Sequence, residues 1–551
     1  MAGIASEVMG GWTRWAASAA VALLAVIAAF GGGSLARWMR PGPAMTVAVA
    51  PSGKLAAELE RWERPDLTLL VTGQQHGYLL PCGCSRPQVG GLERRYNFFQ
   101  TLSSRGWKTV AVDLGDIPQM AGPVNLPNLQ GLTKYRHSMQ ALKLMNYAAV
   151  GLGEYEGSLP LFKALGEYAL NDPSPRVVVA NLADAETNFP EQTARWHLAS
   201  PAGSPWKVGI TSVVGPTVAG KIKDSMAKFG SSRQALEGVK SEMDKAGADY
   251  RILLYQGQFN RVAEGAQPVE AEAAARAFPE YQLIVALSEE DEPAGAPARI
   301  RHADGRETLV VRIGHKGKYV GVLGLYKGPK PESPAHKYTI VQMSEDYLTP
   351  DDQVAGNPIV KLMEAYAAEL RRDGYLGRHP QVVHPFQASV PDASPTFVGS
   401  EKCKKCHASA FAVWQSSPHS HAWQTLADAK RPSLREHDPE CIVCHTVGFG
   451  HKGGFVSAEK TPTLKDVGCE SCHGPSSEHL KNTSDETWHK LMNPWKGQPG
   501  ESAQEKAARQ LKVDQFCQRC HDIDNDVTWT HKGFERKWPK VAHPTPESEK
   551  K

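Results

Sequence analysis

The sequence has almost no net charge and almost no cysteine outside one stretch near its carboxyl end. Its 62 lysines and arginines nearly balance 59 aspartates and glutamates, giving a formal charge of +3 over 551 residues. No long run of one charge sign occurs, so nothing in the composition indicates a nucleic-acid partner. Eight of the ten cysteines belong to the motifs described next, and only Cys82 and Cys84 remain. A framework of disulfides is therefore not expected.

Four Cys-x-x-Cys-His motifs are present, and they indicate covalently bound haem c. Their cysteines are Cys403, Cys406, Cys441, Cys444, Cys469, Cys472, Cys517 and Cys520. In this pattern two thiols add to the porphyrin vinyl groups and the next histidine is the proximal iron ligand. Two Cys-x-x-Cys pairs can also hold zinc, but zinc does not explain a histidine after every second cysteine. The sequence predicts four haems c, with proximal ligands His407, His445, His473 and His521.

The amino terminus contains an uncharged, mostly apolar stretch from Trp15 to Ala36, which is long enough to cross a bilayer as a helix. A cleaved signal peptide is the alternative, because the alanine-rich stretch resembles its apolar segment. The sparse basic residues before it and the lack of a clear cleavage site favour a retained anchor. Since c-type haem is attached outside the cytoplasmic membrane in bacteria, we expect an exported protein, anchored in the inner membrane, with Arg37 onward on the periplasmic side.

Short apolar runs then alternate with helical patterns, which indicates an α/β region with a partly parallel sheet. The expected strands are 67–72, 109–114, 147–150, 176–180, 208–214, 251–255, 282–286 and 308–313. The expected helices are 133–145, 159–170, 232–245 and 269–278. A binding crevice is expected at the carboxyl ends of the strands.

Composition divides the chain into five parts. A signal anchor (1–40) and a linker (41–64) precede the α/β region (65–330). A connector rich in proline and charge (331–395) carries one expected helix at 357–372. The last part (396–551) has few apolar runs and 12 of the 20 histidines. We expect it to be a multihaem domain of helices and loops, whose apolar interior is supplied by the porphyrins.

The haem part contains a single methionine, Met492, so histidine is the expected sixth ligand of most irons, which favours low potentials. From Phe397 onward the sequence resembles the tetrahaem cytochrome c-554 family. The matching segments are 398–403, 414–419, 444–450 and 468–475. The resemblance implies distal ligands at His419, His479 and His543, and one iron without a distal ligand. His421 or His451 could fill that position.

The α/β part resembles the metallophosphoesterase domain of the 5′-nucleotidase family. The resemblance rests on segments 72–77, 90–95, 112–116, 151–154, 254–257 and 286–289. Only His76 and Asp116 match metal ligands of that family, whereas Gln74, Leu152, Gly153 and Gln256 replace others. A two-metal hydrolase needs several carboxylate, imidazole and amide ligands. The resemblance therefore implies a metallophosphoesterase-like sandwich that has lost its hydrolase chemistry.

Cys82 and Cys84 follow the first expected strand and lie near His76 in the chain. These three side chains are soft ligands suited to copper or zinc, or they form a redox site. A strained local disulfide and a pair without function are the alternatives.

The sequence thus predicts a membrane-anchored, exported tetrahaem cytochrome that carries electrons between redox partner proteins. Its α/β part would serve as a docking or regulatory module, and no catalytic residue is expected. One alternative is an oxidoreductase acting on a small nitrogen or sulfur species at a five-coordinate haem. In another, the α/β part is the functional centre and the haems supply it with electrons.

Overall fold

The computed structural model describes residues 55–81, 86–169, 174–189, 191–224, 226–260, 267–327, 335–529 and 532–543. All of them belong to one compact unit that begins at Ala50. The predicted span Trp15–Ala36 and the pair Cys82 and Cys84 lie outside these ranges. Within them, no helix is both long and apolar enough to cross a bilayer.

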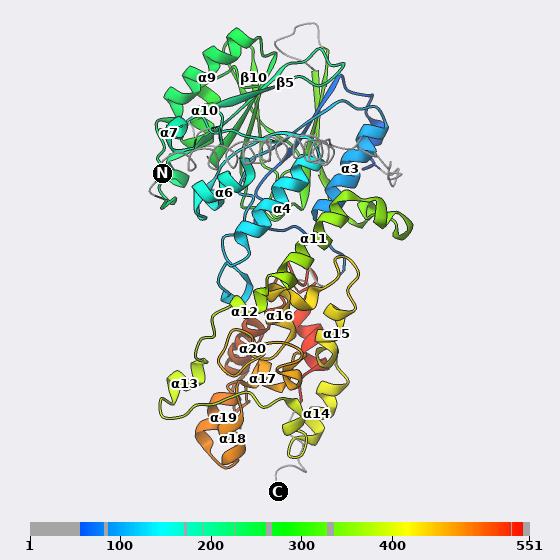
Figure 1. The fold of residues 1–551 in the computed structure, drawn as a ribbon, viewed down its shortest axis with the longest axis vertical. Helices are drawn as coiled ribbons and strands as arrows, with labels where there is room; N and C mark the ends of the chain where they lie inside the picture. Colours follow the sequence, from blue (N-terminus) through cyan, green and yellow to red (C-terminus); the bar gives the residue numbers. More distant parts are fainter. Residues whose placement is uncertain are drawn as a thin grey trace, which may run out of the picture. The chain divides into compact units, whose positions relative to one another are not determined.

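Two six-stranded sheets form the α/β region (Figure 1). The first sheet has the order β12 (Ala335–Gln342), β11 (Tyr319–Tyr326), β1 (Leu67–Thr72), β2 (Thr109–Asp113), β3 (Tyr147–Val150) and β4 (Arg176–Val177). The second has the order β5 (Trp196–Ala199), β6 (Val208–Val214), β7 (Tyr250–Gln258), β8 (Leu283–Leu287), β10 (Glu307–Val311) and β9 (Ala298–Arg301). In the first sheet β1, β2, β3 and β4 pair in parallel, and β11 pairs antiparallel with both β1 and β12. In the second sheet the four middle strands pair in parallel and both edge strands are antiparallel. The expected α/β class with partly parallel pairing is confirmed.

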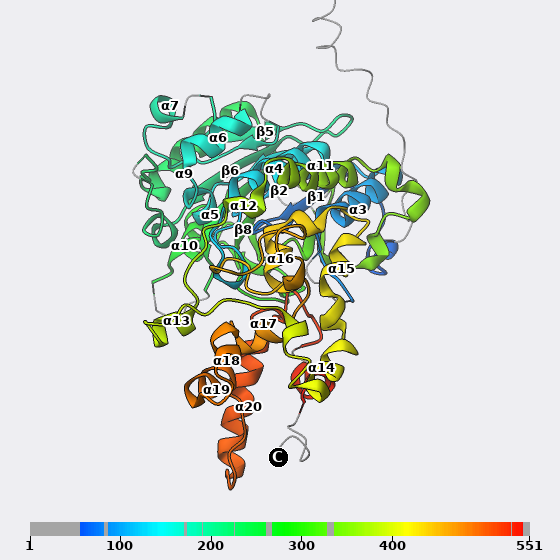
Figure 2. The same cartoon turned by 60° about the horizontal axis from the view of Figure 1, so that its bottom comes forward.

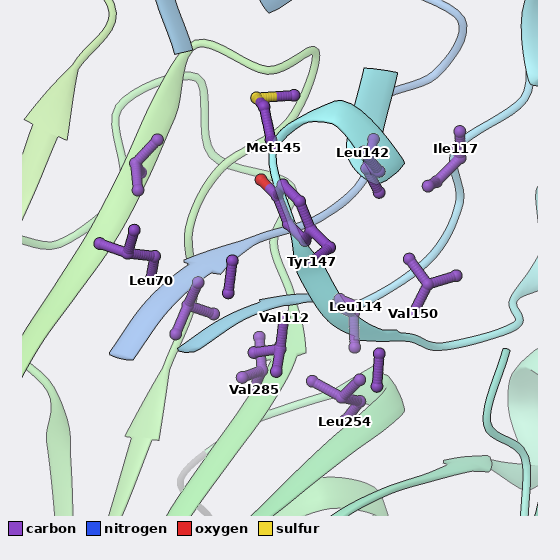
Figure 3. Close-up of a cluster of buried hydrophobic side chains, with 14 of the residues drawn as sticks. Leu70, Val112, Leu114, Ile117, Leu142, Met145, Tyr147, Val150, Leu254 and Val285 are labelled. Carbon is purple, nitrogen blue, oxygen red and sulfur yellow. The ribbon is translucent and has the colours of Figure 1, made fainter. Parts of the chain in front are cut away.

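The two sheets pack face to face through one apolar core. Leu70 and Val112 of the first sheet share this core with Leu254 and Val285 of the second (Figure 3). Every residue of β1 is buried, which is typical of a strand covered on both faces. The sequences of such strands are continuous apolar runs. For this reason the bounds of β1, β3 and β6 agree with those predicted from the sequence.

Helices cover the sheets. They are α3 (Leu92–Ser104), α4 (Gly131–Leu144), α5 (Glu154–Gly157), α6 (Leu161–Ala169), α7 (Ala185–Asn188), α8 (Pro216–Ala219), α9 (Ser232–Ala246), α10 (Glu270–Ala277) and α11 (Pro358–Arg372). Their ends follow local chemistry. Ser231 caps the N-terminus of α9 by accepting from the Gln234 amide, and Gly247 ends it with a left-handed φ of 69°.

The expected connector differs from the structure. Residues 335–342 form β12, the edge strand of the first sheet, so that sheet extends beyond residue 330. Helix α11 agrees with expectation from Pro358 onward, with Asn357 as its N-cap. It also buries Ile359 and Met363 in the main core. The predicted linker likewise ends in packed structure, because Leu55 and Leu59 are buried in that core.

The C-terminal region consists of short helices and loops (Figure 1). Its helices are α12 (Tyr375–Arg378), α13 (Pro385–Ser389), α14 (Ala408–Gln415), α15 (Ala422–Ala427), α16 (Pro439–His445), α17 (Cys469–His473), α18 (Ser477–Lys481), α19 (Glu486–Met492), α20 (Ala503–Cys517) and α21 (Gly533–Lys537). Helices α15 and α16 lie side by side in both views (Figures 1 and 2). The expected mixture of helices and loops is found in the described part of this region.

Helix α16 is joined to the α/β region by buried polar contacts. Gln130 donates to the Asp438 carboxylate at 3.0 Å, and the Lys134 ammonium lies 2.5 Å from Glu440. Leu126 of the α/β region completes a small apolar cluster around Ile442. The second Cys-x-x-Cys-His motif is therefore held directly against the α/β region.

Candidate functional site

The four motifs lie close together in two pairs. The Cys403 thiol is hydrogen-bonded to Cys469, which connects the first motif with the third. Cys520 is hydrogen-bonded to Cys444, which connects the fourth with the second. All eight motif cysteines are free of disulfides. Their thiols therefore remain available for thioether bonds to porphyrin.

Three of the four predicted proximal histidines have their Nδ1 atom fixed by a neighbouring oxygen. Nδ1 of His445 lies 2.6 Å from the Ala422 carbonyl, and Nδ1 of His473 lies 2.6 Å from the Met492 carbonyl. Nδ1 of His521 lies 3.1 Å from the Asp526 carboxylate. A histidine that donates from one ring nitrogen presents the other to a metal. These rings can therefore offer Nε2 to iron.

The three predicted distal histidines each lie opposite a different proximal histidine. The pairs are His407 with His479 at 6.3 Å, His521 with His419 at 6.1 Å, and His473 with His543 at 5.8 Å between ring centroids. An imidazole nitrogen binds a first-row divalent metal at about 2 Å, so two rings on opposite sides of one iron place their centroids roughly 6 Å apart. The observed spacings fit a haem iron between the rings of each pair.

Burial keeps the distal rings in the state that iron requires. Burial, followed by the charges of His521 and His445, lowers the pKa of His419 to about 4. Burial also lowers the pKa of His479, where His489 and His407 add to the effect. Burial thus favours the neutral form of both imidazoles, which has a lone pair available for coordination.

His445 has no such partner among the described residues. Its ring is hydrogen-bonded to Ala422, and no described histidine ring stacks on it. Of the two weaker candidates, His421 is exposed. His451 packs against His384 with 5.0 Å between ring centroids. Neither ring is paired with a proximal histidine in the structure.

At the carboxyl ends of the strands, where the crevice was predicted, side chains bond across the two sheets. The Gln74 amide accepts from the Ser288 backbone N–H at 2.7 Å and donates to the Ser288 carbonyl at 3.1 Å. Gln256 donates to the Leu114 carbonyl at 2.6 Å. Both glutamines occupy positions where the resemblance would place metal ligands. The chain therefore uses neutral amides to hold the sheets together at this edge.

Asp116 and Glu156 form a buried acidic pair beside these glutamines. Glu156 accepts from the backbone N–H groups of Asp116, Ile117 and Gly153. Burial and then the charge of Glu156 raise the pKa of Asp116 well above its usual range. Three N–H donors stabilise the Glu156 carboxylate, whereas burial and the Glu156 charge favour the neutral form of Asp116. A protonated aspartate is a poor metal ligand.

His76 lies at the same edge of the α/β region. Its ring stacks on Tyr155 at 4.1 Å, and its buried Nε2 atom has no hydrogen-bond partner. No group of three or more His, Cys, Asp or Glu side chains capable of holding a metal occurs in the described part of the chain. The structure does not describe Cys82 and Cys84, so the predicted soft-metal site of these cysteines with His76 stays a prediction.

Four attachment motifs with opposed histidines define the C-terminal region as a candidate multihaem c-type cytochrome. Residues 402–474 match the model of the family "Cytochrome c554 and c-prime". The chain is also similar to cytochrome c-554 from Nitrosomonas europaea, with 29% identity over 140 residues. That match covers 23% of this chain and 59% of the relative, so less than two thirds of the relative is represented. Similarity to this family implies covalently bound haem c.

Solved structures similar to this chain include nucleotidases and phosphoesterases. A 5′-nucleotidase precursor from Thermus thermophilus has 22% identity and a TM-score of 0.42, covering 57% of this chain and 60% of that one. The calcineurin-like phosphoesterase YfkN from Bacillus subtilis has 17% identity and a TM-score of 0.40, covering 55% of this chain and 97% of that one. Likenesses of this strength assign no activity to the α/β region.

One feature of the site was not indicated by the sequence. The loop that follows the fourth motif reaches the crevice, where the Tyr78 hydroxyl donates to the Asp524 carboxylate at 3.1 Å. The Lys316 and Lys318 ammonium groups also contact this carboxylate. Three aspartates within five residues after His521 were the only local signal, and such a run is usually a solvated turn.

Proposed function

We propose that this protein is an exported, membrane-anchored cytochrome that carries electrons between redox partner proteins through four haems c. The main support is the set of three histidine pairs with ring spacings of 5.8 to 6.3 Å. Iron held by two histidines has no open position for a substrate and favours low potentials. Such centres accept and donate electrons without a change of ligand.

The adjacency of the motifs supports this role. The cysteine contacts connect the first motif with the third and the second with the fourth. Cys472 of the third motif also lies within electrostatic range of Cys517 and Cys520 of the fourth. The attachment points therefore form one contiguous group, as a relay of electron carriers requires. Export and membrane anchoring rest on the haem motifs and on the apolar stretch 15–36.

The α/β region would act as a docking or regulatory module. Its crevice edge is held by glutamine amides and contains a buried acidic pair in which the pKa of Asp116 is raised, and neither supplies the ligand set that the two metal ions of a hydrolase require. Its contact with Asp438 and Glu440 at the second motif gives it a direct means to influence one haem.

A second function is favoured by one observation, the lack of a described histidine partner for His445. A haem at this motif would have an open position, so an oxidoreductase that acts on a small nitrogen or sulfur species is the alternative. Nitric oxide or cyanide added to the purified protein would then shift a high-spin absorption band. A protein with low-spin bands alone would contradict this alternative.

The electron-transfer proposal is tested by paramagnetic resonance. The spectra of the purified parent protein are compared with those of variants in which a distal histidine is replaced. We expect three low-spin signals and one high-spin signal per chain in the parent. His419→Ala should convert one low-spin signal to high spin, because His419 lies opposite His521. The matched control is His421→Ala, which changes an exposed histidine two residues away and should leave the spectrum unchanged. Conversion by the control, or none by His419→Ala, would overturn the ligand assignment.

A further inference from the structure

The loop after the fourth haem motif places a buried carboxylate against a group of cationic donors in the α/β region. Asp524 is 6% exposed. Its carboxylate contacts the Tyr78 hydroxyl at 3.1 Å, the Lys318 ammonium at 3.1 Å and the Lys316 ammonium. Three donors from one region thus converge on a single anionic group supplied by another.

The backbone that carries the two lysines is held by hydrogen bonds that do not involve Asp524. The Lys316 backbone N–H donates to the Gln74 carbonyl at 2.7 Å, and the Met343 N–H donates to the Lys318 carbonyl at 2.9 Å. Lys316 has a left-handed φ of 60°, and Gly317 follows with a φ of 66°. This turn directs two lysines to the same place at the end of β1. The side chains of Lys316 and Lys318 are 21% and 11% exposed, so water screens them only partly.

Two imidazoles lie next to these donors with nitrogens that have no hydrogen-bond partner. They are the buried Nε2 of His76 and the buried Nδ1 of His315, and the two rings stack at 5.9 Å. Buried polar atoms are nearly always hydrogen-bonded in folded proteins. These two atoms beside a cationic group are hydrogen-bonding capacity that the described residues do not use.

The charge balance indicates an anion. Lys316 and Lys318 carry two positive charges, and Asp291 supplies one negative charge from the other side, 3.3 Å from Lys318 and 3.6 Å from His315. Apart from Asp524, the positive charges of this group therefore exceed its negative charges by one. Although burial opposes ionisation of Asp524, the hydrogen bonds and charges of Lys316 and Lys318 hold its pKa below the usual range. The group stabilises an anion even where burial is unfavourable.

We propose that Tyr78, Lys316 and Lys318, with His76 and His315, form a binding site for a small inorganic oxyanion, and that Asp524 occupies it as an internal, displaceable competitor. The tetrahedral oxygens of such an anion can meet both lysines and the tyrosine, and the remaining oxygens can accept from an imidazole N–H. Binding then requires Asp524 to leave. Its loop also carries Asp526, which is hydrogen-bonded to His521. Occupation of the site would therefore be transmitted to the fourth motif, and this last step alone rests on the proposed haem.

Calorimetric titration of the full-length holoprotein with sodium sulfate tests the site, with sodium chloride of equal ionic strength as reference. Asp524→Asn removes the internal competitor at constant size, so we expect sulfate to bind at least tenfold more tightly than to the parent. Asp392→Asn, which removes the charge of an exposed aspartate elsewhere, should leave the affinity at the parent value. Adding Lys318→Met to Asp524→Asn should abolish the gain. An unchanged affinity in Asp524→Asn would overturn the proposal.

Hydrogen exchange in the parent protein gives a second measurement that needs no variant. Sulfate, but not chloride, should accelerate exchange of the backbone amides at residues 522–526, because the loop is released when Asp524 is displaced. Unchanged exchange would overturn the proposal even if Asp524→Asn failed to fold. Neither measurement depends on iron ligation, so their failure is distinct from failure of the electron-transfer proposal.

Discussion

From Leu55 to Tyr375 the chain buries a continuous set of apolar side chains, whereas after Ser394 its described residues form one small apolar cluster. The first region has two sheets whose inner faces interlock (Figure 3). The second has short helices connected by long loops. Apolar burial contributes roughly 25 cal/mol per Å², so the first region can be stable from its own side chains.

The second region needs another source of apolar interior. Its cluster consists of Leu426, Ile442, Val447, Phe449, Phe455 and Leu464, and Leu126 of the α/β region completes it. Meanwhile the motif cysteines and the paired histidines face one another across the region. The difference teaches that side-chain packing accounts for the interior of the first region, whereas in the second region the described side chains supply one small apolar cluster.

The largest expected effect comes from removing one attachment point. With Cys441→Ser and Cys444→Ser, we expect haem content to fall from four per chain to three. Residues 396–543 should become sensitive to limited proteolysis, because Ile442 and Val447 would lose their apolar neighbour. The α/β region should stay resistant. In the control, Cys82→Ser with Cys84→Ser, haem content should not change. If the C-terminal region of this variant resisted proteolysis as well as that of the parent, its packing would not depend on the attached haem.

The second largest effect is expected from a cavity in the α/β core, which should lower the free energy of unfolding of the protein. Leu254 is fully buried between the sheets, so Leu254→Ala should lower the free energy of unfolding by about 2–5 kcal/mol. Urea denaturation followed by circular dichroism measures this loss. Leu144→Ala, at a leucine that is 42% exposed, should change stability by less than about 0.5 kcal/mol. Equal losses in the two variants would show that the sheets are not held by this core.

The same contrast explains which parts of the molecule were predictable. Most strands buried on both faces were found because their apolar runs are continuous, as in β1 and β6. The buried strand β11 was missed, because Gly321 and Gly324 interrupt its apolar run. Helix α3 was missed because its buried face carries Arg94 and Arg95, which pair with Gln88 and Gln75 and interrupt the apolar pattern. Strand β12 was missed because it is an edge strand with alternating exposure.

At the site, the sequence motifs could be predicted, whereas the pairing of histidines far apart in the chain could not. The spacing within each Cys-x-x-Cys-His motif predicts attachment and proximal ligation without any tertiary structure. The resemblance supplied His419, His479 and His543, but only the structure shows which proximal ring each one faces. The contact of Asp524 with Lys316 joins segments far apart in the chain and has no local pattern.

A third prediction concerns the buried acids of the α/β region. Since the pKa of Asp116 is raised in the folded chain, folded protein binds more protons than unfolded protein at neutral pH. Stability should therefore fall as pH rises above about 4, by about 1.4 kcal/mol per pH unit for one proton. The loss continues until the pair titrates, and burial places the pKa of its partner Glu156 at about 7.

Urea denaturation of the parent and of Asp116→Asn between pH 5 and pH 7 measures the contribution of Asp116 to the pH dependence of stability. Asparagine mimics the protonated aspartate and can still accept from the Tyr155 N–H, so the difference between the two proteins should grow as pH rises. Asp249→Asn, at an exposed aspartate, serves as control and should follow the parent. Parallel pH profiles for parent and Asp116→Asn would show that Asp116 is ionised in the fold.

The smallest expected effect concerns the hydrogen bond between Asp526 and His521 in the second region. We expect this bond to adjust the reduction potential of one haem. Asp526 is 2% exposed and its carboxylate accepts from Nδ1 of His521 at 3.1 Å. An anionic partner makes an imidazole a stronger donor to iron and stabilises the oxidised state, which lowers the potential. Asp526→Asn should raise the potential of one haem by about 59 mV, a tenfold change for a one-electron couple. Redox potentiometry measures this shift.

Glu535→Gln, which removes an exposed charge nearby, should leave all potentials in place. A uniform shift of every haem would instead indicate a general change in surface charge, and the proposed specific link between Asp526 and His521 would fail.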